Sequence, residues 1–63
     1  MTHDEIVERL RVLKRRMKWS NKDIGERSGV NYNTVRKLIA GENIGLYPFL
    51  DILDAMGLEI NII

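Results

Sequence analysis

Apolar residues recur at helical spacing in the first part of the chain. Four of them follow one another at intervals of four, three and four residues, which places them on one face of an α-helix. Thr2 and Glu5 form a T-x-x-E capping box, a pattern that marks a helix start. We therefore expect a helix from about His3 to Met17 with one face directed into a core. That face consists of Ile6, Leu10, Leu13 and Met17.

The stretch from residue 21 to residue 40 predicts two short helices separated by a glycine turn. Val35 and Leu38 lie three residues apart and share one face of the later helix. Gly29 can adopt the positive φ of a sharp turn, and the small Gly25 leaves room for the helices to cross closely. This layout is typical of a helix-turn-helix. We expect the two helices at about residues 21–28 and 32–40.

The last third of the chain predicts a loop, a fourth helix and a strand. Glu42 to Leu46 has the composition of a loop, Pro48 fits the first turn of a helix, and Gly57 ends that helix. The segment Leu58 to Ile63 is rich in β-branched residues and partly alternating, which favours a strand. The apolar face of the fourth helix consists of Phe49, Ile52, Leu53 and Met56.

These elements predict a mainly all-α fold, a compact four-helix domain over residues 1–63 with a short C-terminal β-strand. A chain of 63 residues buries only about 60% of its unfolded surface, so we expect it to be stabilised by association. It has no cysteine and one histidine, His3 near the N-terminus, which we interpret as an exposed surface residue rather than a metal ligand. We therefore expect no disulfide, no metal and no cofactor.

Several function classes find no support in the sequence. No stretch approaches the roughly 18 apolar residues of a membrane span, and the acidic, polar N-terminus is unlike a signal peptide. The chain has no glycine-rich phosphate loop and no nucleophile with a base at a recognisable spacing. We therefore expect a cytoplasmic protein that has no membrane partner, no catalytic residues and no enzymatic activity.

Positive charge is concentrated in the middle of the chain. All ten Lys and Arg residues lie between Arg9 and Lys37, where only Asp23 and Glu26 oppose them, so this segment has a net charge of +8. Such asymmetry suggests a polyanionic partner, although an ordinary solvated helix surface is the alternative. Trp19 interrupts the basic run, and we interpret it as a core residue rather than a platform for base stacking.

The helix-turn-helix stretch resembles the phage repressor and Cro family of DNA-binding proteins, an XRE-like family. Ser28 departs from the family pattern, which more often has an apolar residue there. The resemblance implies a transcriptional regulator of double-stranded DNA whose second motif helix enters the major groove. The residues that carry it, counted from Asn21 as the first of twenty, are Ile24, Gly25, Gly29, Val30, Val35 and Leu38 at positions 4, 5, 9, 10, 15 and 18.

Burial constraints select the residues that read bases. Val35, Leu38 and Ile39 of the third helix are apolar and should face inward, which leaves one polar face of that helix outside. On that face an asparagine pairs bidentately with adenine and a basic residue reaches guanine. The tyrosine packs on a thymine methyl group or donates to a phosphate, and the sequence does not choose between these. The predicted base contacts are Tyr32, Asn33, Arg36 and Lys37.

Phosphate contacts are expected from helix starts and loops. The start of the second helix presents backbone N–H groups to a phosphate, and the family has a glutamine at the position of Asn21. For Asn31, capping of the third helix is an equally supported reading. The predicted phosphate contacts are Asn21, Lys22, Asn31, Thr34 and Asn43.

The C-terminal strand predicts the oligomeric state. The backbone groups of a strand need a second strand to pair with, and no other segment of the chain is predicted to be a strand. A second copy of the protein is the simplest source of that partner strand. We expect a homodimeric repressor on a palindromic operator; the alternative for the strand is to fold back on its own helices. The tail also resembles antitoxin-type members of the family, which bind a toxin partner as well as DNA. The predicted dimerisation residues are Leu58, Ile60 and Ile62.

Overall fold

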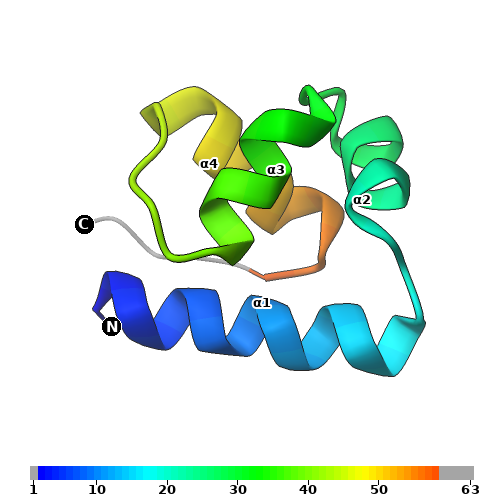
Figure 1. The fold of residues 1–63 in the computed structure, drawn as a ribbon, viewed down its shortest axis with the longest axis horizontal. Helices are drawn as coiled ribbons and strands as arrows, with labels where there is room; N and C mark the ends of the chain where they lie inside the picture. The colour runs from blue at the N-terminus through cyan, green and yellow to red at the C-terminus, as the bar shows by residue number, and fades with distance from the viewer. Residues whose placement is uncertain (1, 59–63) are drawn as a thin grey trace.

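Four α-helices make up residues 2–58, the part of the chain that the computed structural model describes. The longest helix lies along one side, and the three shorter helices gather over it (Figure 1). The predicted all-α fold with its helix-turn-helix is confirmed. The predicted strand lies outside the described residues, apart from Leu58. The helices are α1 (His3–Met17), α2 (Asn21–Ser28), α3 (Tyr32–Ile39) and α4 (Leu46–Ala55).

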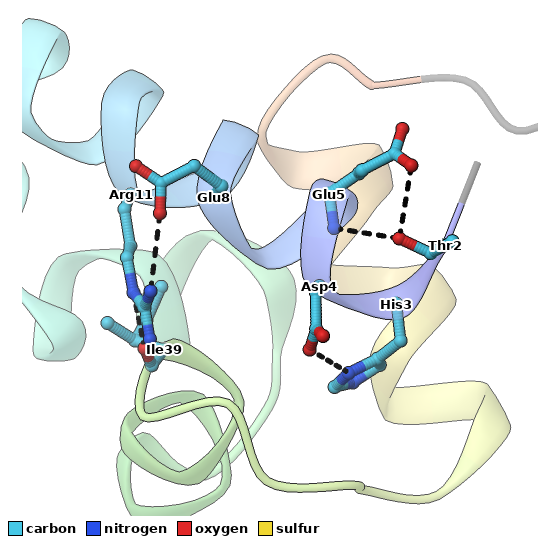
Figure 2. A network of polar contacts seen from close by, with 7 residues as sticks. All are labelled: Thr2, His3, Asp4, Glu5, Glu8, Arg11 and Ile39. Carbon is cyan, nitrogen blue, oxygen red and sulfur yellow. Dashed lines mark hydrogen bonds and ion pairs between the residues drawn. The ribbon is translucent and has the colours of Figure 1, made fainter.

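Side-chain caps define where the first two helices begin. The hydroxyl of Thr2 accepts the backbone N–H of Glu5 at 3.2 Å and donates to its carboxylate (Figure 2). Ser20 and Asp23 form a full capping box at α2, because each side chain accepts the other residue's backbone N–H, at 3.1 and 2.9 Å. Ser20 is therefore the N-cap of α2, and Asn21 is the first residue of the helix.

The α2–α3 turn depends on two glycines and a serine. A Cβ atom on Gly25 would lie 2.8 Å from the carbonyl oxygen of Val30, so the two helices cross too closely for a larger residue. Gly29 has a φ of 75° and ends α2. The half-buried Ser28 hydroxyl donates to the carbonyl of Ile24 at 2.7 Å and accepts the N–H of Val30 at 3.3 Å. Ser28 therefore bridges α2 to the turn at a position where the family more often has an apolar residue.

The hydrophobic core lies between α1 and the three shorter helices. In α1 the buried face includes Val7, and Met17 is 42% exposed, so the predicted core position of Met17 is wrong. Trp19 is half-buried and packs against the core at that end of α1, which leaves the last turn of the helix outside. The buried residues are Ile6, Val7, Leu10, Ile24, Val35, Leu38, Ile52, Leu53 and Met56.

Two side chains of α1 make contacts that were not predicted from the sequence. His3, expected at the surface, is half-buried and stacks on the ring of Phe49 with centroids 6.1 Å apart. Arg11, one of the ten basic residues between Arg9 and Lys37, donates from Nε to the carbonyl of Ile39 at 2.9 Å and from Nη1 to the carboxylate of Glu8 at 3.3 Å (Figure 2). Arg11 therefore ties α1 to the end of α3.

The remaining helix ends lie within a few residues of the positions expected from the sequence. The third helix ends one residue early, at Ile39, and α4 begins at Leu46, which had been expected in the loop. Gly41 and Gly57 both adopt positive φ after the helices they follow. Over residues 2–58, no helix combines the length and apolar character that crossing a bilayer requires.

Candidate nucleic-acid interface

One face of α3 is exposed and polar. Tyr32 is 54% exposed, and the three other predicted base-contacting residues, Asn33, Arg36 and Lys37, are exposed as well. Val35 on the opposite face is fully buried, and it holds the helix in this orientation together with Leu38. None of the four polar side chains has a hydrogen bond or ion pair within residues 2–58. The face is therefore available to an external partner.

The start of α2 lies beside the start of α3. Lys22 is exposed and lines a shallow groove between these helices together with Tyr32. The Ser20 hydroxyl accepts the N–H of Asp23, so the N–H groups of Asn21 and Lys22 remain at the open helix end. Asn21 is half-buried, and its Oδ1 is buried without a hydrogen-bond partner in the described chain. A phosphate contact by Asn21 would use the Nδ2 donor of the same amide.

The other predicted phosphate contacts differ in their surroundings. Asn31 is exposed, and its Oδ1 accepts the backbone N–H of Asn33 at 2.8 Å, which caps α3. Its Nδ2 group is the donor that a phosphate would use. Thr34 is half-buried on the flank of α3, and Asn43 is exposed in the loop between α3 and α4. The structure thus groups Asn31 with the α2 start and leaves Asn43 at the opposite end of α3.

The Asp23 carboxylate has a defined electrostatic role at the start of α2. The backbone N–H of Ser20, and after it the Ser20 hydroxyl, lowers the pKa of Asp23, and Arg27 and Lys22 lower this pKa further. Asp23 is therefore ionised at neutral pH and stabilises the folded chain there. This contribution is lost as the pH falls below the ordinary aspartate pKa towards the lowered one. This carboxylate accepts the backbone N–H of Ser20 at 2.9 Å and so serves the cap of α2.

A second hollow lies between α1 and the end of α3. The guanidinium of Arg27 stacks over the ring of Trp19 at 4.2 Å from the ring centre, a cation–π contact that holds both side chains. The sequence showed the basic run around Trp19, but not that several of its cations converge beside α3. The hollow is lined by Arg11, Lys14, Arg15, Lys18, Trp19 and Ile39.

Only one of the predicted dimerisation residues lies in the described part of the chain. Leu58 is half-buried and lines an apolar groove on α1 together with Val12 and Leu13. Val12 is 41% exposed, so the groove is open to solvent or to a partner. Ile60 and Ile62 lie outside the described residues. Within residues 2–58 no group of three or more His, Cys, Asp or Glu residues has an arrangement that would hold a metal ion.

Comparison with known proteins places the four-helix arrangement in a family. The family described as "Homeodomain-like domain" matches residues 3–49, which include α1, α2, α3 and the first residues of α4. No curated protein and no solved structure matches the chain. The matched region contains both hollows and the exposed face of α3, so the family assignment bears on the whole candidate interface.

Proposed function

Because this chain belongs to the homeodomain-like family of helix-turn-helix DNA-binding domains, we propose that it is a sequence-specific repressor that binds a palindromic operator as a homodimer. The single observation that carries the proposal is the exposed polar face of α3 beside the open start of α2. The family match supports a DNA-binding regulator of the helix-turn-helix class. The narrower assignment to the phage repressor and Cro type is supported by the spacing of residues within 21–40.

In the proposed complex α3 lies in the major groove. The groove is wide enough for one helix, and each base pair presents a distinct set of donors and acceptors there. Asn33 pairs with adenine, while Arg36 and Lys37 reach guanine. Tyr32 lies at the start of α3 next to Lys22, where it contacts a thymine methyl group or the DNA backbone.

The phosphate contacts position this helix without reading sequence. The N–H groups at the start of α2, with the Lys22 side chain, bind one phosphate beside the groove. Asn31 and Thr34 act near the start of α3, and Asn43 acts beyond its end. Of these, Lys22 is the strongest candidate because it is exposed and makes no ion pair within residues 2–58.

We expect DNA binding to weaken steeply with salt. Lysine and arginine side chains that neutralise phosphates release counterions, and the log–log slope changes by roughly −0.9 for each phosphate. Titration of the protein with its preferred duplex and with an unrelated duplex, each at several salt concentrations, measures both slope and specificity. An affinity that is the same at every salt concentration and for both duplexes contradicts the proposed function.

The proposed dimer contact is the C-terminal segment. Leu58 donates its N–H to the carbonyl of Leu53 at 2.9 Å, and Gly57 donates to that of Asp54 at 3.1 Å. This C-terminal cap directs the chain from α4 onto the apolar groove beside Val12. Residues 2–58 contain no strand, so a second copy would supply the partner that a strand requires.

Loss of the segment should separate the two copies. Deleting the residues after Gly57, or replacing Ile60 by lysine, should give a monomer or an unfolded chain with much weaker operator binding. Asn61→Lys is the matched control, because alternate residues of a strand face opposite sides. Sedimentation and circular dichroism of the variants decide the matter. A stable dimer without the segment would place the interface elsewhere in the protein.

An antitoxin-type protein that binds a toxin partner and regulates its own operon is the alternative function. The observation that favours it is the same apolar groove on α1, where Val12 is 41% exposed. A toxin gene beside the gene for this chain would favour the antitoxin reading. A homodimer of the isolated chain that binds its operator without any other protein favours the repressor.

A further inference from the structure

The hollow between α1 and the end of α3 has the properties of an anion site. We propose that this basic notch, defined by the side chains of Lys14, Arg15 and Lys18 around Trp19, binds phosphates of the DNA backbone beside the groove that α3 enters. The inference rests on the proposed function, because it takes duplex DNA as the ligand. It adds α1 to a set of phosphate contacts that the sequence assigned only to α2, α3 and the following loop.

The charge of the notch is not neutralised within the described chain. No carboxylate lines it, and Arg11 alone among its cations forms an ion pair, with Glu8. Lys14, Arg15 and Lys18 make no ion pair within residues 2–58. Cations near a helix C-terminus suit the helix dipole, but that effect falls off within the last turn. Lys14 and Arg15 lie in that last turn and Lys18 is the C-cap residue, so the dipole favours these cations at the end of α1. It does not account for the hollow that their side chains line together with Trp19 and Ile39.

The notch adjoins both parts of the motif that face DNA. Ile39, which lines the notch, is the last residue of α3 and is half-buried, between the buried face at Val35 and the exposed side at Arg36. Trp19, its other apolar wall, directly precedes Ser20, the cap of α2. The end of α1 leads into the start of α2, and α1 contacts α3, while the α2–α3 turn lies on the side away from α1 (Figure 1). A backbone strand that passes the start of α2 would continue along the notch.

The walls of the notch are fixed, while its cations are not. Arg11 is held against the carbonyl of Ile39 at 2.9 Å, which keeps α1 in place beside α3. Arg27 holds the ring of Trp19 at 4.2 Å. The side chains of Lys14, Arg15 and Lys18 make no hydrogen bond or ion pair within residues 2–58, so each can turn towards a phosphate without rearrangement of the helices. A fixed apolar floor with adjustable cations suits a backbone contact rather than base reading.

The salt dependence of DNA binding tests the notch. The double variant Lys14→Gln with Lys18→Gln should make the log–log slope shallower by about one to two for each protomer bound, because each lost phosphate contact contributes roughly 0.9. It should weaken binding to preferred and unrelated duplexes alike. Lys14→Arg with Lys18→Arg should restore the wild-type slope. Circular dichroism shows that each variant remains folded.

A matched pair on the other side of α1 provides the control. Arg9→Gln with Arg16→Gln removes the same charge beside Leu58, away from the notch. Sedimentation first establishes that this variant keeps the oligomeric state of the wild type, since both residues line the groove at Leu58, and its slope should then be steeper than that of the lysine pair. The single tryptophan gives a second measurement, because bound DNA should protect Trp19 from quenching by iodide. The proposal that the notch binds DNA phosphates is overturned if the two double variants have equal salt slopes. It is also overturned if iodide quenches Trp19 equally with and without DNA. Absence of any wild-type DNA binding would instead overturn the proposed function.

Discussion

Replacing Gly25 by valine should destabilise the domain by about 1–3 kcal/mol, the usual cost of forcing extra atoms into a packed interior. The first added atom would lie 2.8 Å from the carbonyl oxygen of Val30 and 3.4 Å from the backbone nitrogen of Tyr32. Both are backbone atoms, so relief requires α2 and α3 to move apart. A loss of this size is a large share of the free energy of unfolding of a small domain.

Urea unfolding followed by circular dichroism measures the Gly25→Val effect. Glu26→Val is the matched control, since it places the same side chain on the exposed neighbouring position of α2. We expect the control to lie within about 0.5 kcal/mol of the wild type. Equal stability of the two variants would mean that the α2–α3 crossing is looser than described.

Arg36→Ala and Asn33→Ala should each lose about 1–3 kcal/mol of affinity for the preferred DNA site, which is roughly a 5- to 150-fold loss. Each removes a side chain that reaches base edges from the exposed face of α3. Binding to unrelated duplexes should change little. Lys22→Ala provides the contrast, because a phosphate contact should weaken binding to all sequences equally.

Fluorescence anisotropy titrations of these three variants with both duplexes give the required comparison. The diagnostic quantity is the ratio of the two affinities, which falls for Arg36→Ala and Asn33→Ala and stays constant for Lys22→Ala. If Arg36→Ala binds the preferred site as tightly as the wild type, α3 faces the DNA with a different side.

The helix-turn-helix was predictable because its constraints are local. Gly29 supplies a positive φ that few other residues adopt, and the spacing of Val35 and Leu38 fixes the buried face of α3. The exposed position of Arg36 follows from that burial alone. The roles of these residues in binding DNA are predictions that the Arg36, Asn33 and Lys22 variants test.

Features that depend on tertiary neighbours were not predictable. Periodicity placed Met17 in the core, but Trp19 covers that end and leaves Met17 outside. Composition showed Arg11 only as one of ten basic residues, whereas in the structure it donates to the carbonyl of Ile39, 28 residues away in the chain. Neither outcome is encoded in local spacing. The basic notch was missed for the same reason, because it exists only where α1 meets α3.

Selection of binding sites from random duplex DNA tests the central claim most directly. The wild-type chain is incubated with a pool of randomised duplexes, and the bound molecules are amplified and sequenced over several rounds. We predict enrichment of one palindromic motif whose half-site centres are about 34 Å apart, one helical turn of duplex. A pool that remains random after those rounds would contradict the account of this protein as a sequence-specific DNA-binding regulator.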